Sequence, residues 1–293
     1  MAAEVFGIGK APILNIIFLL LTGMKIFAIS VIKNEADIIK DNLLDASKWA
    51  DKIFVLDNGS TDNTWEIVKS LASDKIIPWK SENKPFYDGI RGEVFNEFRH
   101  LASEDDWWCF RLDADEFYED NPVDFLTKVS QRCHFVATDT IHFWITKEDV
   151  LENMLTDNSS DNLKNIRYYE RKTWTEARFF RHRKYMVWAA GDELPRHMGV
   201  LSSRRIKVRH YQYRSLQQIV QRITVRKQAV ANGFVGWGHA IKENIDDYLY
   251  NRKDLNFYDN NGGWQLEGSH NKYFQRQYDV IIKYVLFKLG IYK

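Results

Sequence analysis

Apolar runs of strand length alternate with amphipathic stretches over the first 112 residues, and this alternation constrains the fold more than any other feature. The apolar runs are 25–32, Lys52–Leu56, Lys75–Trp79 and Trp107–Leu112. Apolar residues at helical spacing follow the first three runs, over Glu35–Ala50, up to Ser70 and over Asp88–Ala102. Such repeats predict a parallel sheet wrapped by right-handed crossovers, and ligands bind these sheets outside the carboxyl ends of the strands.

The pattern changes after about residue 134. His134–Ile145 alternates and is rich in aromatic residues, which favours an antiparallel or mixed strand. Residues 166–187 are expected to form further strands or a hairpin. Ile206–Tyr211 is predicted to be a strand, and a helix is predicted over Ser215–Ala231. The second half is therefore expected to complete the sheet in a less regular way.

The amino terminus carries an apolar run that needs a separate interpretation. Ala11–Leu21 is apolar except for Asn15 and follows Lys10, so it imitates the core of a signal peptide. It is too short to span a bilayer, and no A-x-A-like cleavage site follows it. We predict that residues 1–23 are an extension without chemistry; a membrane-leaning helix is the alternative. Residues 24–232 are predicted to form the main domain, and 233–293 a helical appendage.

Composition excludes several classes of protein. The 293 residues hold 41 Lys and Arg against 40 Asp and Glu, so no bulk charge favours nucleic-acid binding. A hydrophobic share of 45% and an aromatic share of 14% exclude a mainly disordered chain. Cys109 and Cys133 are too few for a disulfide scaffold and lack metal-ligand spacing. We expect a cytoplasmic protein, with peripheral contact to a membrane surface left open.

Three polar segments directly follow three of the predicted strands. They are Lys33-Asn34-Glu35, the turn-rich loop 57–64 and Asp113-Ala114-Asp115-Glu116. On an extended backbone the side chains of Asp113 and Asp115 point the same way, so both carboxylates are predicted to face one site. Mg²⁺ is commonly held by one or two carboxylates together with phosphate oxygens. A solvated acidic pair at a strand end is the alternative.

These three segments, in this order, resemble the family 2 nucleotide-sugar glycosyltransferases of the GT-A fold. The resemblance is carried by Val31-Ile32-Lys33-Asn34-Glu35-Ala36-Asp37, Asp57 to Thr64 and Leu112 to Glu116. It implies an α/β fold with a GT-A-type, Rossmann-like, mostly parallel sheet flanked by helices, followed by the helical appendage. It also implies metal-dependent transfer of a sugar from a UDP- or GDP-linked donor to an acceptor hydroxyl, with inversion and with Mn²⁺ or Mg²⁺ as cofactor. The expected acceptor is a glycan or glycolipid, lipid-linked or protein-linked.

The resemblance assigns expected roles by position. The residues expected to bind the nucleotide sugar are Val31, Lys33, Asn34, Glu35, Asp57, Asn58, Gly59, Arg91, Asp113 and Ala114. Asp115 is expected to coordinate the metal, with Asp113 contacting the metal or the ribose. Arg91 lies where the family often has a basic residue near the donor; a solvated helix charge is the alternative. Asn58-Gly59-Ser60 is a glycosylation sequon, and a glycan there would block the expected site.

The second half offers a candidate base, because inverting family members use a carboxylate to take the acceptor proton. Gly191-Asp192-Glu193-Leu194-Pro195 follows the aromatic, basic run Arg178–Arg183. We favour Glu193 over Asp192 as the catalytic residue. A related branch has His-Glu here, so Asp192 departs from the pattern. Acids at a helix N-terminus are the alternative interpretation.

Basic and aromatic residues near the carboxyl terminus suggest further contacts. His210-Tyr211 resembles a histidine–tyrosine pair of the same family branch, so His210 is expected to complete the metal shell or touch the diphosphate; a structural hydrogen bond is the alternative. Arg222, Arg226 and Lys227 share a helix face that could meet phosphates or solvent. Lys272–Leu289 is predicted to be a final helix that packs, makes an oligomer contact or lies on a membrane.

Two rival functions remain at this stage. A phosphatase of the haloacid-dehalogenase type also places Asp-x-Asp after a strand, but it wants Thr or Val where this chain has Phe117. It also opens its core with that motif, whereas several strand–helix units precede Asp113 here. The other rival is a GT-A-like carbohydrate- or nucleotide-binding protein without turnover.

Overall fold

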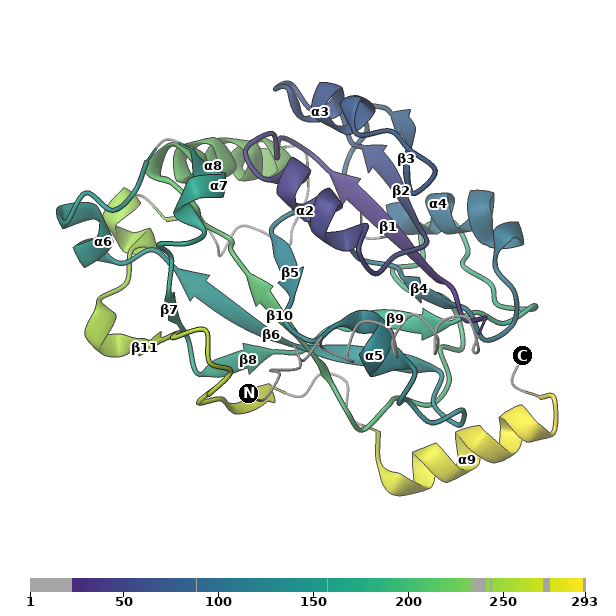
Figure 1. Cartoon of the computed structure of the whole chain (residues 1–293). Coiled ribbons are helices and arrows are strands. Elements are labelled where there is room, and N and C mark those ends of the chain that lie inside the picture. Colours follow the sequence, from purple (N-terminus) through teal and green to yellow (C-terminus); the bar gives the residue numbers. More distant parts are fainter. Residues whose placement is uncertain are drawn as a thin grey trace, which may run out of the picture.

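A 12-stranded sheet organises the protein, in a computed structural model that describes residues 23–87, 89–156, 158–231, 233, 241–242, 244–270 and 275–291. The regular part of the sheet contains β1 (Ile26–Ile32), β2 (Lys52–Asp57), β3 (Ile76–Ser81) and β4 (Trp107–Cys109). They lie in the order β3-β2-β1-β4, and every neighbouring pair is parallel (Figure 1). The parallel sheet predicted from the alternating runs is therefore confirmed.

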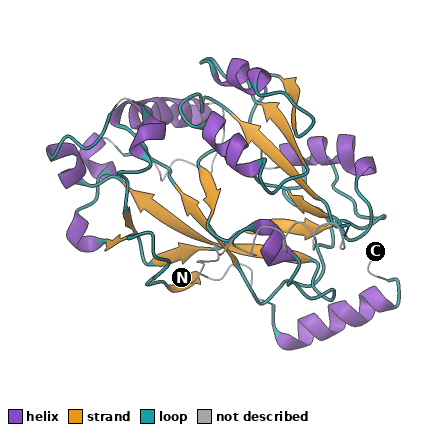
Figure 2. Ribbon diagram, viewed as in Figure 1, coloured by secondary structure: helices purple, strands orange, loops and turns teal. Residues whose placement is uncertain are grey.

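Helices cover both faces of these strands (Figure 2). They are α2 (Ile39–Ala46), α3 (Thr64–Ser70) and α4 (Ile90–Phe98), the first and last shorter than the sequence suggested. Two clusters of buried hydrophobic side chains pack on the two faces of these strands. Successive residues of β1 point to opposite faces: Ala28 packs in the first cluster with residues of α2, and Phe27 packs in the second with residues of α4. Both clusters are buried, which explains why these strands are apolar throughout.

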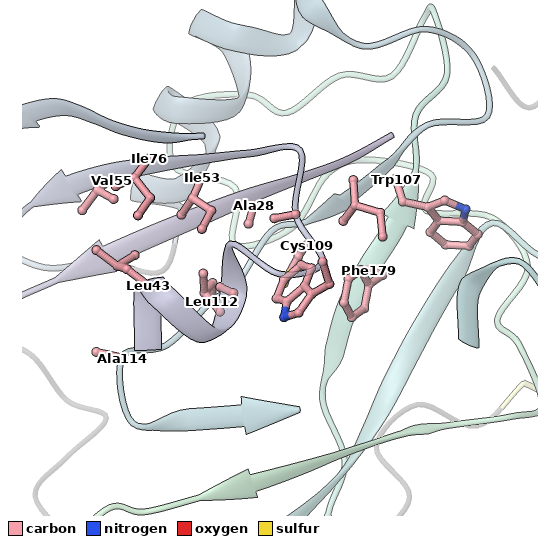
Figure 3. Close-up of a cluster of buried hydrophobic side chains, with 14 of the residues drawn as sticks. Ala28, Leu43, Ile53, Val55, Ile76, Trp107, Cys109, Leu112, Ala114 and Phe179 are labelled. Atoms are coloured by element: carbon pink, nitrogen blue, oxygen red, sulfur yellow. The ribbon is translucent and has the colours of Figure 1, made fainter. Parts of the chain in front are cut away.

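The first of these clusters lies directly beneath the acidic motif (Figure 3). Ile53 and Val55 of β2 pack there with Leu43 of α2, and Leu112 and Ala114 belong to the same cluster. Burial of Leu112 and Ala114 fixes the backbone on both sides of Asp113. The carboxylates are thus held by a packed core rather than by a free loop.

The fourth strand ends earlier than predicted. β4 stops at Cys109, although Leu112 N still donates to Ile29 O at 2.9 Å, and Ala114 and Asp115 lie in a turn. The sequence predicted that an extended backbone would point both carboxylates the same way. That explanation is wrong, because the backbone at Ala114 and Asp115 is not extended. The turn brings them to the same place instead.

The second half completes the sheet with mixed pairing. β9 (Ala177–Arg181) pairs antiparallel with β4, and β6 (Phe135–Trp144) pairs antiparallel with β9. β10 (Ile206–His210) is parallel to β6 and antiparallel to β5 (Glu116–Tyr118). The mixed strand predicted over His134–Ile145 is confirmed. β10 thereby brings the second half against the strand that follows Asp115.

Short elements connect these strands. They are η1 (Arg99–Leu101), α5 (Pro122–Leu126), α6 (Lys147–Leu151), α7 (Ser159–Asn162), β7 (Tyr168–Tyr169), β8 (Lys172–Trp174), η3 (Ile245–Tyr248) and η4 (Arg252–Asp254). The longest helix among the described residues is α8 (Leu216–Ala231), close to the helix predicted over Ser215–Ala231. It follows β10 and lies beside the cavity described below.

The carboxyl-terminal region contains strands as well as the expected helix. β11 (Asn256–Phe257) pairs with β7, and β12 (Glu267–His270) pairs with β8, so this region joins the sheet. α9 (Gln277–Lys288) is the predicted final helix. The domain boundary at 232/233 stays a prediction, and residues 1–22 of the expected extension lie outside the described residues. Within the described residues, no helix has both the length and the apolar character to cross a membrane.

Candidate active site

A cavity of about 1430 Å³ opens at the carboxyl ends of β1, β2 and β3. Its wall receives the loops after these strands, the turn at Asp113, one face of β6, the segment from β8 into β9, and α8. The predicted site residues on the wall are Val31, Lys33, Asn34, Glu35, Asn58, Arg91, Asp113, Ala114, Asp115, Glu193 and His210. Asp57, Gly59 and Asp192 are not on the wall.

Asp57 and Gly59 shape the second loop from behind. The Asp57 carboxylate is buried and accepts hydrogen bonds from Ser60 N at 3.2 Å and from Ser81 Oγ at 2.7 Å. Gly59 has a φ of 75°, and a Cβ there would lie 2.6 Å from the Cβ of Asn83. Both residues therefore hold the loop in the form that presents Asn58 and Asn83 to the cavity.

Asn58 lines the cavity and has a buried side-chain oxygen. Its side chain is 2% exposed, and its Oδ1 has no hydrogen-bond partner among the described residues. A buried carbonyl oxygen without a partner is unfavourable unless something else donates to it. Asn58 N donates to Ile32 O at 2.8 Å, which ties this loop to the end of β1. The loop thus presents a fixed acceptor at the cavity wall.

Asp115 is surrounded by cationic side chains. Its Oδ2 lies 2.9 Å from Arg222 Nη1, 3.3 Å from His210 Nε2 and 3.8 Å from Arg214 Nη1. Burial alone would raise the pKa of Asp115, but the charges of His210 and Arg222 outweigh it and hold the pKa well below its usual value. Asp115 is therefore ionised at neutral pH.

Asp113 faces the same cavity in a wetter position, with its side chain 30% exposed. Its Oδ1 accepts from Arg91 Nη2 at 3.0 Å, and its Oδ2 lies 3.6 Å from Arg178 Nη2. Arg91 is only 6% exposed, so the alternative of a solvated helix charge does not apply to it. The two carboxylates of the motif therefore have separate sets of cationic partners.

Arg178 and Arg214 are the buried counterions of the site. Arg178 binds Glu116 through two nitrogens, at 3.1 and 2.5 Å, and Glu176 at 2.6 Å. Arg214 donates to Glu35 at 2.7 Å and to both oxygens of Asp37 at 2.9 Å. Burial raises the pKa of Glu35 to about 6, against the lowering effect of the Arg214 and Arg222 charges. Each arginine joins an acid of the first half to an element of the second.

His210 is paired with a second histidine across the β10–β6 register. His210 Nδ1 lies 2.9 Å from His142 Nδ1, so one of these nitrogens carries the proton and the other accepts it. Burial, reinforced by the charge of His210, lowers the pKa of His142 to about 3, so His142 is neutral. His210 therefore has a fixed ring orientation, with Nε2 directed at Asp115.

Sequence reasoning missed several residues of the wall. They are Thr140, His142, Trp144, Trp174, Glu176 and Arg178. Their spacing could have identified them, because side chains two residues apart on a strand point to the same face. The first three are spaced in this way along β6, and the last three from β8 into β9. Arg222 and Arg226 of the predicted basic face also line the cavity, whereas Lys227 does not.

The two candidate bases have different surroundings. Glu193 is on the cavity wall, whereas the Asp192 carboxylate is bound to Arg196 Nε at 2.8 Å. The loop that carries both is held near α4, because Trp188 Nε1 donates to Asp192 O at 2.9 Å and a Cβ on Gly89 would lie 2.5 Å from that oxygen. Of the two candidate bases, Glu193 therefore faces the cavity, and Asp192 is paired with a cation outside it.

Comparison with known proteins then decides the family. The family model described as "Glycosyl transferase family 2" matches residues 28–181, which is 154 of the 293 residues. The chain belongs to glycosyl transferase family 2. The match includes the three motif loops and ends at β9. It identifies this family 2 member as a glycosyltransferase with a nucleotide-sugar donor, confirms the predicted family and fold class, and excludes the phosphatase interpretation.

Other comparisons add little to the family match. A solved structure similar to this family 2 chain is the crystal structure of mannosyl-3-phosphoglycerate synthase from Rubrobacter xylanophilus. It is 12% identical, with 73% of this chain and 75% of that chain covered and a TM-score of 0.32. No curated protein sequence matches this chain. Glu193, His210, Arg222 and Arg226 of this family 2 site lie beyond the matched range, so their position on the cavity wall comes from the structure and not from the family match.

Proposed function

We propose that this glycosyltransferase moves a sugar from a UDP- or GDP-linked donor to a hydroxyl of a glycan or glycolipid acceptor, with inversion at the anomeric carbon. The observation that carries the proposal is that the three motif loops of the first half and His210, Arg222 and Glu193 of the second half line one cavity. Its volume of about 1430 Å³ exceeds that of ordinary small-molecule sites, which span roughly 300–1,000 Å³. It therefore has room for donor and acceptor together.

The nucleoside would lie against the loops that follow β1 and β2. Asn58 lines the cavity at this point, and its Oδ1, which has no partner among the described residues, would accept from a base N–H or a ribose hydroxyl. Asn34 and Glu35 lie on the facing loop, and Asn34 Oδ1 accepts from Thr61 N at 2.7 Å, which locks the two loops together. This support explains how the nucleoside would find a preformed site.

The diphosphate would lie near Asp115 and the cations around it. Within the described residues no three His, Cys, Asp or Glu side chains are grouped as a metal site. Two protein ligands nevertheless suffice for Mg²⁺ that also binds phosphate oxygens, and Asp115 Oδ2 lies 3.3 Å from His210 Nε2. Asp115, together with His210 after loss of the Nε2 proton and with Asp113 nearby, would thus hold Mn²⁺ or Mg²⁺. Such an ion offsets charge that develops on a leaving diphosphate.

The chain's own side chains would complete the transfer. The acceptor oxygen forms a bond to the anomeric carbon while the bond from that carbon to the diphosphate oxygen breaks. The acceptor proton passes to Glu193, and the electron pair leaves with the nucleoside diphosphate. Arg222 and Arg91, which contact Asp115 and Asp113, are placed to counter the negative charge of the leaving group.

The direct test is release of nucleoside diphosphate from UDP- and GDP-sugars, with Mn²⁺, with Mg²⁺ and with a chelator. Stabilisation against heat by each donor identifies the ones that bind, because a ligand that binds only the folded state raises its stability. We expect one donor class to stabilise the protein and to release its diphosphate when metal and a glycan acceptor are present. Binding without release under all acceptor conditions would instead favour a carbohydrate- or nucleotide-binding protein.

The base is tested by a matched pair of variants in one loop. Glu193→Gln is expected to lower kcat by about 10²-fold or more, because a positioned general base contributes about 10²–10⁴-fold. Asp192→Asn is expected to keep kcat near the wild-type value, because Asp192 is bound to Arg196. The reverse result would assign the proton transfer to Asp192. Equal, small effects would remove this loop from the chemistry.

A further inference from the structure

Helix α9 presents an apolar stripe to solvent. Tyr278, Ile281, Ile282, Val285 and Leu289 are 51%, 63%, 54%, 47% and 66% exposed. Their spacing of three and four residues places them on one side of the helix. Large apolar side chains scattered singly on a surface are ordinary, whereas these five adjoin one another along one side of a single helix. α9 lies at the periphery of the molecule (Figure 1).

The opposite side of α9 is already packed on the protein. The Phe287 ring lies 4.4 Å from the His134 ring, and the Arg132 guanidinium lies 5.3 Å from the centre of the Tyr284 ring. Before the helix, Gln275 accepts from Leu201 N and donates to Gly199 O, both at 2.9 Å. The inner side of the helix therefore holds it on the protein. The outer stripe is not needed for that packing.

The size and charge of the stripe favour a lipid surface over a protein partner. Twelve helical residues extend about 18 Å, and a helix is about 10 Å wide, so the stripe offers about 180 Å². A stable protein interface needs about 800 Å² from each partner. Shallow insertion between lipid headgroups needs only one apolar helix face. Over 276–289 the charges of Arg276, Lys283 and Lys288 exceed that of Asp279, a net +2 that suits anionic lipids.

The start of the described chain lies on the same side of the molecule. Lys25 N donates to Asp106 Oδ1 at 2.8 Å, and His182 N donates to Asp106 O at 2.6 Å. The next residue, Arg183, lies 5.8 Å from the centre of the Phe287 ring of α9. Lys25, near the start of the described chain, therefore lies on the side of the molecule that carries α9.

We propose that α9 docks this protein on an anionic phospholipid surface, with the stripe from Tyr278 to Leu289 inserted at the headgroup level. Lys288 flanks the stripe, where it can meet lipid phosphates. The docking is independent of the sugar-transfer reaction and of its metal.

Co-sedimentation of the full chain with phosphatidylcholine vesicles, with and without phosphatidylglycerol, tests the proposal. We expect binding to be stronger when phosphatidylglycerol is present. Ile281→Ser/Leu289→Ser is expected to weaken it about tenfold or more, through the lost apolar burial. The matched control is Leu151→Ser/Val220→Ser, which removes two side chains that are 79% and 48% exposed on α6 and α8. The three proteins differ only at these side chains, so the difference in vesicle binding isolates α9.

Equal binding by wild type and Ile281→Ser/Leu289→Ser would overturn the proposal. So would a wild-type protein that ignores vesicles but self-associates in light scattering, with self-association lost in this variant. That result would make the stripe a protein interface. Circular dichroism checks that the variants are folded, and diphosphate release from a water-soluble acceptor assay reports separately on the proposed reaction.

Discussion

Opposite charges from the two halves of the molecule pair at the cavity wall and behind it. In this network the first half, up to β5, supplies the acids Glu35, Asp37, Asp113, Asp115 and Glu116, and the second half supplies their partners Arg178, His210, Arg214 and Arg222. The division is not complete, because Arg91 and Arg111 of the first half and Glu176 and Glu193 of the second half also line the cavity. The site is therefore built across the boundary between a regular parallel sheet and an irregular mixed one.

This division links folding to function. A buried charge that loses its partner is strongly destabilising, so each half depends on the other for its own stability. The cations that neutralise Asp115 and Glu35 in the structure are also those nearest to the proposed diphosphate. Replacing these acids and cations one at a time is therefore expected to have different effects. Some variants lose turnover, others lose stability and others lose donor affinity.

The largest effect is expected at Asp115. Asp115→Asn keeps the shape of the side chain but removes the charge that His210 and Arg222 face. We expect diphosphate release to fall by about 10³-fold, the upper range for loss of one preorganised electrostatic group. Asp74→Asn, at an exposed acid remote from the cavity, is the control. Near wild-type turnover in Asp115→Asn would contradict the proposed site.

The next effect is on stability, at Arg214. Arg214→Leu leaves Glu35 and Asp37 without the buried guanidinium that binds both. We expect the free energy of unfolding to fall by about 3 kcal/mol in urea denaturation. Arg196→Leu is the control, because the Arg196 side chain that binds Asp192 is 58% exposed. This variant is expected to change the free energy of unfolding by less than about 1 kcal/mol. Equal losses would show that the two halves are not joined by this buried network.

A smaller effect is expected at Arg222, the cation of α8 that contacts both Asp115 and Glu35. Arg222→Gln is expected to raise KM for the donor about tenfold with less change in kcat, because a charge-assisted contact to phosphate contributes roughly 1.5–3 kcal/mol. Lys227→Gln changes a neighbouring cation that does not line the cavity, and is expected to leave KM unchanged. Identical donor kinetics in the two variants would exclude Arg222 from donor binding.

The first half was largely predictable because its signals are local. Buried parallel strands must be apolar on both faces, so β1 and β2 are visible as uninterrupted runs, and polar residues that follow them mark the site. The lengths of the helices were less predictable. Glu35 and Asp37 precede α2 rather than begin it, because they bind Arg214, which is 177 residues or more away in the chain.

The second half was less predictable because its site residues depend on register. His142 meets His210 only because β6 and β10 pair in parallel at that position, and no local pattern specifies the pairing. Arg178 stood within a basic run that gave no sign that it would be buried against Glu116. Strand alternation in β6 could have identified Thr140, His142 and Trp144 as one face, but not what they face.

The smallest predicted effect concerns acid sensitivity, and it belongs to the second half. Burial, with the charges of Arg183 and Arg181, lowers the pKa of His134 to about 4. Its Nδ1 accepts from Val200 N at 3.1 Å, which requires that nitrogen to be unprotonated. The unfolded chain takes up this proton near the usual value of about 6.5, so the contribution to stability is present above that pH and is lost as the pH falls toward 4.

His134→Asn tests this contribution, because an amide oxygen can accept from Val200 N without titrating. Between pH 7 and pH 6 the wild type should lose about 0.7 kcal/mol more unfolding free energy than the variant. His100→Asn, at an exposed histidine of the first half, is the matched control for removal of an imidazole. Parallel pH dependences for wild type and His134→Asn would mean that the strand–loop contact at Val200 tolerates the proton. The acid sensitivity of the second half would then have to come from other groups.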